Sequence, residues 1–146
     1  MDIVTNIEKE FFPTIYTKSL NSTSDIKLCL VKSKFLARYC LCAFELKENI
    51  PINLQIEEAR CSIKKHLKAS VFLRSVGVYL IFISNSLNGI AKEDLRVDQT
   101  GLHSVIIQGI HVLSTSGEHI YNHTKWLNHA FGNTVNIAKQ IECIGI

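Results

Sequence analysis

The chain has 146 residues, a formal net charge of +3, 47% hydrophobic residues and 20% charged residues. Its length predicts one domain over residues 1–146, since two domains would each approach the lower size limit for an independent core. The mild charge argues against a nucleic-acid partner, and no apolar stretch reaches the roughly 18 residues of a membrane span.

Residues 2–12 are predicted to form a short amphipathic helix. Ile3, Ile7 and Phe11 recur every four residues, and Pro13 ends the pattern. The acidic residues of this segment differ from the basic start of a secretory signal, so we expect a cytoplasmic protein.

Residues 26–31 and 35–46 are predicted to form a hairpin. The first segment alternates with Ile26, Leu28 and Leu30 directed inward, as in a half-buried strand. The second is apolar on both faces, so periodicity leaves a buried strand and a buried helix both open. Its aromatic content and the short turn before it favour the strand.

Residues 53–70 give the strongest helical pattern, with Ile56, Ala59, Ile63, Leu67 and Ser70 on one side. Asn53 is expected to cap its start. We expect this helix to pack on one face of the sheet. Lys64 and Lys68 form a short basic stripe, which we interpret as a solvated helix face because no wider basic patch accompanies it.

The second half of the chain is predicted to be rich in strands. Residues 76–83 form a continuous apolar run typical of a central strand, and the long polar connection 84–101 contains a helical turn near 90–95. A hairpin over 103–124, a short helix at 125–131 and a last strand at 134–144 follow. The predicted fold is α+β: an antiparallel sheet of about five strands with one main helix, 53–70. Its exposed sheet edge favours a homodimer.

The five cysteines are interpreted as free cysteines packed in a core, because each has apolar neighbours and their number is odd. Cys40 and Cys42 share a face if their segment is a strand. That spacing could serve a soft metal ion or a redox pair, but no second such pair completes a four-ligand site. We therefore expect neither a metal site nor a cofactor.

Histidines are concentrated in the 103–124 hairpin and just after it: His103, His111, His119, His123 and His129. If Thr115–Gly117 is a three-residue loop with a left-handed glycine, then His111, His119, Tyr121 and His123 share one face. If the turn has two residues, His111 moves to the opposite face and the cluster is lost. The sequence leaves both registers open.

The spacing of these histidines fits a metal site poorly. Residues four apart on a strand are about 13 Å apart, so His119 and His123 can barely meet at one zinc ion. Asp98 and Glu118 are the nearest acids in sequence that might orient an imidazole. Trp126, together with His123 and Tyr121, is a candidate contact for a ligand or partner, because tryptophan and tyrosine dominate binding hot spots.

Two classes of function follow from these patterns. The leading hypothesis is a small non-enzymatic binding protein that holds a protein partner or a small ligand, as stand-alone bacterial accessory or toxin-neutralising immunity proteins do. The alternative is a small enzyme or metal-binding protein that uses His111, His119, Tyr121 and His123, with 84–101 as a lid. The enzyme hypothesis predicts a concave pocket and a histidine with a shifted pKa at this face.

Overall fold

The computed structural model describes residues 2–34, 37–71, 74–100, 102–125 and 134–144. Its elements in chain order are α1 (Ile3–Phe11), β1 (Lys18–Leu20), β2 (Leu28–Lys34), β3 (Ala37–Glu45), α2 (Ile52–Leu67), β4 (Val76–Ser84), the short 3-10 helix η1 (Lys92–Asp94), β5 (Val105–Ser114), β6 (His119–His123) and α3 (Thr134–Glu142). The α+β content agrees with the sequence prediction. None of the helices in the described ranges is long and apolar enough to cross a membrane.

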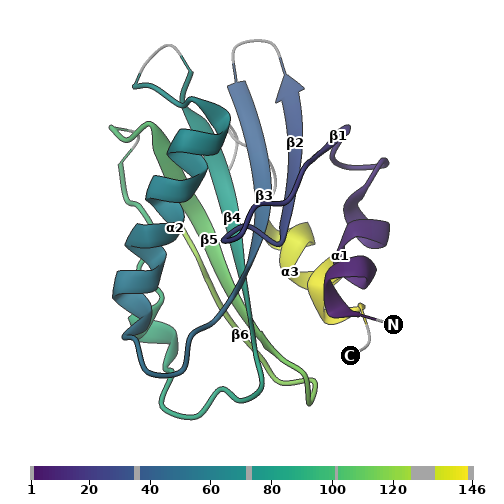
Figure 1. Ribbon diagram of the computed structural model, residues 1–146, viewed down its shortest axis with the longest axis vertical. Helices are drawn as coiled ribbons and strands as arrows, with labels where there is room; N and C mark the ends of the chain where they lie inside the picture. The colour runs from purple at the N-terminus through teal and green to yellow at the C-terminus, as the bar shows by residue number, and fades with distance from the viewer. Residues whose placement is uncertain (1, 35–36, 72–73, 101, 126–133, 145–146) are drawn as a thin grey trace.

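The sheet has six strands in the order β1-β2-β3-β4-β5-β6 and is mixed (Figure 1). The pairs β1–β2, β2–β3 and β5–β6 are antiparallel, whereas β3–β4 and β4–β5 are parallel. The prediction of an antiparallel sheet of about five strands is therefore wrong. Two long connections, one through α2 and one through η1, return the chain to the starting end of the sheet, which makes β3, β4 and β5 run in the same direction.

One face of the sheet forms a buried cluster with α2 and the β4–β5 connection. Helix α2 contributes its predicted apolar stripe to this cluster: Ile56, Ala59, Ile63 and Leu67. The helix differs from the prediction at both ends. Pro51 takes the N-cap position, so Asn53 lies inside the helix and does not cap it, and Ser70 lies beyond the last turn and is exposed.

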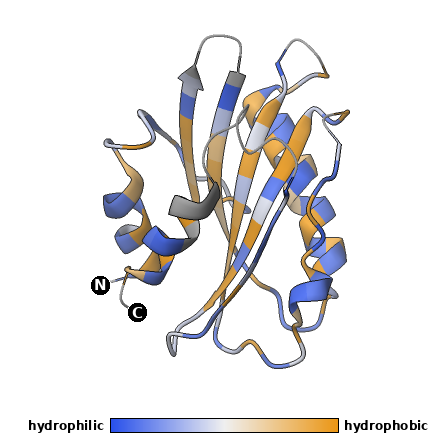
Figure 2. Ribbon diagram, turned by 180° about the vertical axis from the view of Figure 1, so that it is seen from behind, coloured by the Kyte–Doolittle hydropathy of each residue, from blue (hydrophilic) through white to orange (hydrophobic). Residues whose placement is uncertain are grey.

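The opposite face forms a second buried cluster with α1 and α3. Ile3, Ile7 and Phe11 of α1 are buried there as their spacing predicts, together with Ile137 and Ile141 of α3. Figure 2 shows both helices over this face, with strands coloured mostly as hydrophobic behind them.

The predicted strand over 134–144 is wrong, because α3 occupies Thr134–Glu142. The buried residues Ile137 and Ile141 are four apart, which places both on one side of a helix. Their spacing is also compatible with a strand, since residues an even number apart share a strand face. The short strand β1 was missed, and the predicted helix over 125–131 lies almost wholly outside the described residues.

Candidate functional sites

The hairpin of β5 and β6 has the register that brings the histidines together. His111 pairs with Tyr121 and Leu113 with His119, and the backbone N–H of Ser114 donates to the Glu118 carbonyl over 2.9 Å. Gly117 has a φ of +96°, the left-handed conformation that the three-residue loop needs. The interpretation with Thr115–Gly117 as the loop is therefore confirmed, and the two-residue turn is excluded.

The three imidazoles form a continuous chain through His111. Its Nδ1 lies 2.9 Å from Nε2 of His119, and its Nε2 lies 2.7 Å from Nε2 of His123. The ring of Tyr121 is nearly parallel to that of His111, with 5.4 Å between the ring centroids. A neutral imidazole has one N–H and one lone pair, so His111 donates to one neighbour and accepts from the other.

Burial keeps the cluster uncharged. His111 is completely buried, and desolvation, followed by the nearby charges of His123 and His119, holds its pKa well below the usual value. Desolvation also lowers the pKa of His123 to about 4 and lowers that of His119, where the carboxylate of Glu142 on α3 acts in the opposite direction. The rings are therefore bases at neutral pH.

One neighbour of this cluster carries a buried polar group without a partner. The ring of Tyr79 meets that of His123 edge-on, with centroids 5.5 Å apart, and its buried hydroxyl has no hydrogen-bond partner. The side-chain amide of Gln108, 1% exposed, is also without a partner. Buried polar groups are nearly always paired, so the Tyr79 hydroxyl beside the His123 ring is a polar group that the described protein atoms do not satisfy.

The acids expected to orient the imidazoles have other roles. Asp98 binds the guanidinium of Arg60 through two contacts of 2.7 and 2.8 Å, on the α2 side of the sheet. Glu118 is exposed and accepts a 3.4 Å hydrogen bond from the hydroxyl of Ser116. Trp126 and His129 lie outside the described residues.

A large open hollow lies at the end of the sheet where β3 and β4 finish. Its volume is about 1340 Å³, and its walls come from the segment before β2, the chain after β3, the first half of α2 and the end of β4. None of the cluster histidines lines it. Six acidic residues and two lysines do: Asp2, Asp25, Glu45, Glu48, Glu57, Glu58, Lys27 and Lys47.

The register of β2 and β3 brings charged groups of both signs to this hollow. Asp25 lies just before β2 and Glu45 is the last residue of β3; these strands are antiparallel neighbours, so the two residues lie at the same end of the sheet. Lys27 lies 3.9 Å from the Glu45 carboxylate, and Lys47 lies 3.8 Å from that of Glu58. All these groups are in contact with solvent.

The chain beyond β3 is held in place by one buried amide. The side chain of Gln55, 5% exposed, accepts a 2.8 Å hydrogen bond from the Lys47 N–H and donates to the carbonyls of Lys47 and Ile50 over 2.8 Å each. The first turn of α2 thereby fixes the backbone beside Glu45. Sequence reasoning missed the hollow, because whole-chain net charge hides an acidic end.

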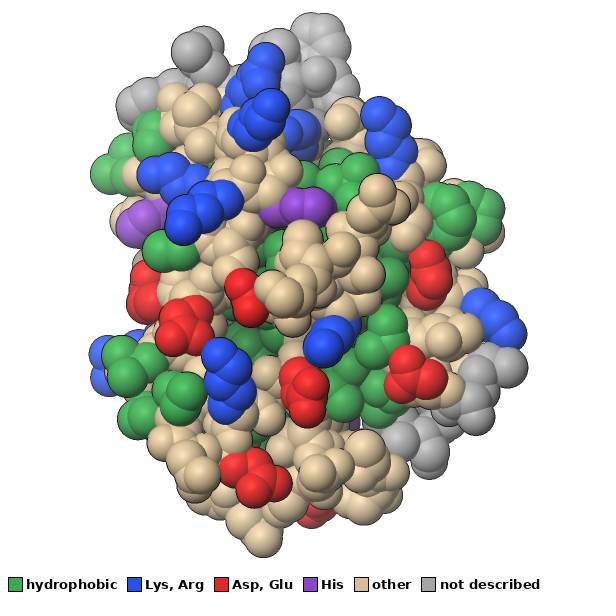
Figure 3. All heavy atoms as spheres, viewed as in Figure 1, with side chains coloured by type: hydrophobic (Ala, Val, Ile, Leu, Met, Phe, Trp, Pro, Cys, Tyr) green, Lys and Arg blue, Asp and Glu red, His purple; other side chains and the backbone are tan. Residues whose placement is uncertain are grey.

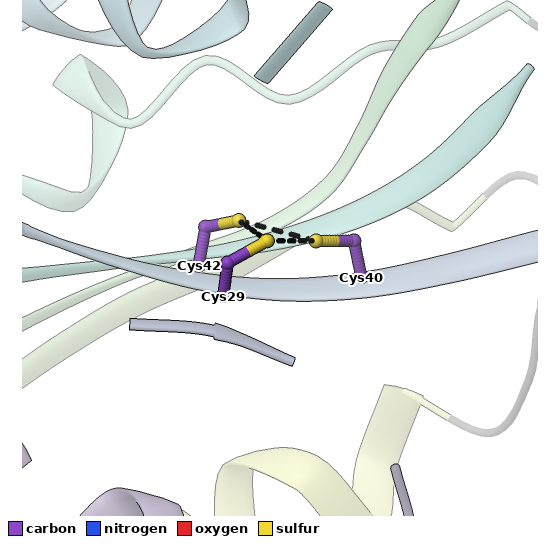
Figure 4. A group of neighbouring side chains, drawn as sticks. All are labelled: Cys29, Cys40 and Cys42. Carbon is purple, nitrogen blue, oxygen red and sulfur yellow. Dashed lines mark hydrogen bonds between the residues drawn. The ribbon is translucent and has the colours of Figure 1, made fainter. Parts of the chain in front are cut away.

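Three of the five cysteines come together on the α2 side of the sheet. Cys29, Cys40 and Cys42 are completely buried, as expected for core cysteines, and their sulfurs lie 3.1–3.6 Å apart (Figure 4). Hydrogen bonds from the other two thiols lower the pKa of Cys29 to about 4. Cys61 and Cys143 are exposed, so for these two the prediction of core packing is wrong.

Searches of protein-family models, curated proteins and solved structures find no match to this chain.

Proposed function

We propose that the protein is a binding protein that holds a phosphate-bearing ligand in the hollow through a divalent cation. The observation that carries this proposal is the hollow at the carboxyl ends of β3 and β4, lined by Asp25, Glu45, Lys27 and Lys47. In open sheets with parallel strands, ligands bind preferentially beyond the carboxyl ends of the strands. This proposal keeps the leading class expected from the sequence and moves the site away from the sheet edge.

The residue types support both halves of this ligand. Mg²⁺ and Mn²⁺ prefer oxygen ligands and are commonly held by one or two carboxylates plus phosphate oxygens of the substrate. In this site Asp25 and Glu45 supply the carboxylates, and the ammonium groups of Lys27 and Lys47 face the phosphate as point charges. The hollow is larger than the roughly 300–1,000 Å³ typical of small-molecule sites, which leaves room for a ligand bigger than a free phosphate.

The charge distribution of the visible surface supports a cation at this end. In Figure 3 the acidic side chains lie across the middle and lower part of the view, with some Lys and Arg among them, while the charged side chains of the upper part are Lys and Arg. Helix α2 follows the same gradient, with Glu57 and Glu58 near its start and Lys64 and Lys65 in its last turn. A net positive chain therefore carries a locally negative hollow that attracts cations.

The first prediction tests the cation with Mn²⁺ as the probe. Mn²⁺ is expected to bind one site per chain, measured by the loss of its free EPR signal, and inorganic pyrophosphate is expected to strengthen that binding. Asp25→Asn with Glu45→Gln removes both carboxylates and is expected to weaken Mn²⁺ binding more than tenfold. Lys47→Met is expected to remove only the pyrophosphate effect.

Exposed acids outside the hollow provide the matched control. Glu10→Gln with Glu93→Gln makes the same change of net charge as the paired variant, on exposed side chains away from this site. Equal Mn²⁺ affinity in both double variants would mean that the loss of affinity comes from the change of net charge alone, which would contradict the proposal. The absence of a stoichiometric Mn²⁺ site would also contradict it.

A second candidate function, acid–base catalysis at the histidine cluster, is favoured by the N···N chain through His111. A proton taken up at one half-buried ring, His119 or His123, can pass through His111 and leave from the other ring, so base and acid can act at separate points of one site. Tyr121 adds a phenol that can donate a hydrogen bond to a substrate. This candidate is the alternative expected from the sequence.

The second prediction concerns the pH dependence of stability. The unfolded chain protonates histidine near pH 6.5, whereas the folded chain keeps His111 neutral well below that value. The free energy of unfolding is therefore highest above pH 6.5 and falls as the pH drops below that value. His111 alone contributes a slope of about 1.4 kcal/mol per pH unit. Urea unfolding between pH 8 and pH 4 measures it.

Histidines inside and outside the cluster separate this effect from general acid unfolding. His103→Gln changes an exposed histidine away from the cluster and serves as the reference variant. His123→Gln removes a ring whose pKa burial lowers to about 4, so it is expected to flatten the slope. If the two variants have the same pH slope of the free energy of unfolding, the imidazoles are charged in the folded protein. Proton transfer between neutral rings through His111 is then refuted.

A further inference from the structure

Three thiols from two neighbouring strands converge at one point beneath α2. Cys29 and Cys42 are register partners on β2 and β3, and Cys40 lies two residues before Cys42, so all three side chains share a sheet face. The Cys40 sulfur lies 3.1 Å from that of Cys42 and 3.6 Å from that of Cys29, and the remaining pair is 3.5 Å apart. Figure 4 shows the three sulfurs directed toward one another.

The triangle has nearly the size of a metal-thiolate site. A zinc ion about 2.3 Å from each sulfur in tetrahedral geometry separates the sulfurs by about 3.8 Å. Expansion of each edge by a few tenths of an ångström reaches that value from 3.5–3.6 Å, and the 3.1 Å edge needs slightly more. The sulfurs are well beyond the roughly 2.05 Å of a disulfide. Among the described residues, the three sulfurs form the one group of three or more potential metal-ligand atoms that all lie within 4.8 Å of one another.

A candidate fourth donor lies on α2, which packs over this face of the sheet. Nε2 of His66 is buried and has no hydrogen-bond partner, and it is not among the donor atoms that lie within 4.8 Å of one another, so the imidazole has to move toward the sulfurs to bind the same ion. His66 lies on α2 between Ile63 and Leu67, both of which are buried against the sheet. With three thiols on the sheet and this unpartnered imidazole nitrogen on α2, the residue types match the Cys₃His ligand set of structural zinc sites.

A positive charge lies next to the site as well. The guanidinium of Arg38, two residues before Cys40 on the same strand face, acts electrostatically on the Cys40 thiol. It donates hydrogen bonds to the backbone carbonyls of Leu67 and Arg74, while its Nε is buried without a partner. Three thiolates and one Zn²⁺ carry a net charge of −1, which a neighbouring guanidinium compensates.

We propose that Cys29, Cys40, Cys42 and His66 bind one structural zinc ion that ties β2 and β3 to α2. On binding, zinc–sulfur bonds replace the S–H bonds of the protonated thiols, whose protons pass to solvent, and the neutral imidazole donates its lone pair. No oxidation is involved. The site is separate from the acidic hollow, whose oxygen ligands suit hard cations, whereas thiolates select soft ones.

Co²⁺ substitution tests this site in the full chain. Protein purified under reducing conditions, stripped of metal while unfolded and refolded without oxygen is titrated with Co²⁺. One equivalent is expected to produce thiolate-to-cobalt charge-transfer absorption and the visible bands of a tetrahedral ion, and one equivalent of Zn²⁺ is expected to abolish both. Absence of the charge-transfer bands would overturn the proposal.

The chain supplies matched controls for the cysteine variants. Cys29→Ser, Cys40→Ser and Cys42→Ser are each expected to weaken Co²⁺ binding more than about a hundredfold. Cys61→Ser and Cys143→Ser, at the two exposed cysteines, are expected to leave the spectrum and affinity unchanged. His66→Asn is expected to retain the charge-transfer bands with a shifted visible spectrum, because one ligand is replaced. Equal losses at exposed and buried cysteines would refute the assignment.

A measurement on the unmodified chain tests the site even if the variants of the buried cysteines do not fold. X-ray absorption at the zinc edge is expected to give three sulfurs at about 2.3 Å and one nitrogen at about 2.0–2.1 Å. A shell of oxygen or nitrogen alone would place the ion elsewhere and overturn the proposal. Mass spectrometry that finds a disulfide between two of the three cysteines in reduced, freshly purified protein would overturn it too.

Discussion

Replacement of Asp98 by alanine is expected to lower the free energy of unfolding by about 3–5 kcal/mol, because it leaves a largely buried guanidinium without its counter-charge. The side chains of Asp98 and Arg60 are only 10% and 16% exposed, and two hydrogen bonds of 2.7 and 2.8 Å join them. Urea unfolding at neutral pH measures the loss.

The loss is expected to exceed that of an ordinary ion pair because Asp98 also pairs with the backbone. Its Oδ2 accepts a 2.7 Å hydrogen bond from the N–H of Ile107, and its own N–H donates to the Ile107 carbonyl over 2.9 Å. Arg60 donates to the Val105 carbonyl over 2.6 Å. These bonds fasten the β4–β5 connection to α2 and to the start of β5.

A double-mutant cycle isolates the charge pair. Arg60→Met removes the guanidinium and keeps part of its apolar stem, so Asp98→Ala is expected to cost clearly less in that background. Glu57 supplies an internal comparison: its carboxylate also contacts Arg60, at 3.3 Å, but it is 64% exposed, so Glu57→Ala is expected to cost less than about 1 kcal/mol. A loss below about 1 kcal/mol for Asp98→Ala would contradict this account.

Local patterns predicted the elements that depend on neighbours in sequence. The apolar spacings of Ile3–Phe11 and Ile56–Leu67 identified α1 and α2, whereas the sequence around Thr115–Gly117 predicted a hairpin with two possible registers. The three-residue loop fixes the register of β5 and β6, and with it the shared face of His111, His119, Tyr121 and His123. The left-handed conformation of Gly117 selects between the two registers, and that conformation is seen only in the structure, so the sequence predicted this part of the candidate site as one of two alternatives.

Strand direction depends on how a connection crosses the sheet, which hydrophobic periodicity does not report. The helix between β3 and β4 is long enough for a parallel crossover, so the first parallel pair could have been inferred. The second crossover, through residues 85–104, carries only the short helix η1. Its path depends on the Arg60–Asp98 contact, between residues 38 positions apart.

The cysteine triangle and the hollow were missed for a related reason. Cys40 and Cys42 were recognised as sharing a face, but Cys29 joins them only through the register of β2 against β3. Asp25 and Glu45 likewise reach one hollow because antiparallel neighbours end and begin at the same edge of the sheet. In both cases the residues meet across neighbouring strands. The sequence shows the residue types, but only the strand pairing shows which of them lie together.

Gly109→Ala is expected to lower the free energy of unfolding by about 1–3 kcal/mol and to break the imidazole chain. A Cβ atom at this position would lie 2.7 Å from Cδ1 of Tyr79 and 2.9 Å from Nε2 of His123, both closer than real Cβ atoms approach their neighbours. Gly109 pairs directly with His123 across the hairpin, so the methyl group must displace that ring from His111.

Two measurements distinguish displacement of the ring from a general loss of packing. In the His123→Ala background the added methyl group meets a smaller neighbour, so Gly109→Ala is expected to cost less there, with the contact to Tyr79 setting the remainder. Nitrogen NMR of the imidazoles is expected to show Nε2 of His111 losing its hydrogen-bonded shift in Gly109→Ala, while Nδ1, which faces His119, keeps its own. If both nitrogens keep their shifts, His123 is not held against His111 by the close approach of the two strands. The proposed proton transfer from ring to ring then lacks its structural basis.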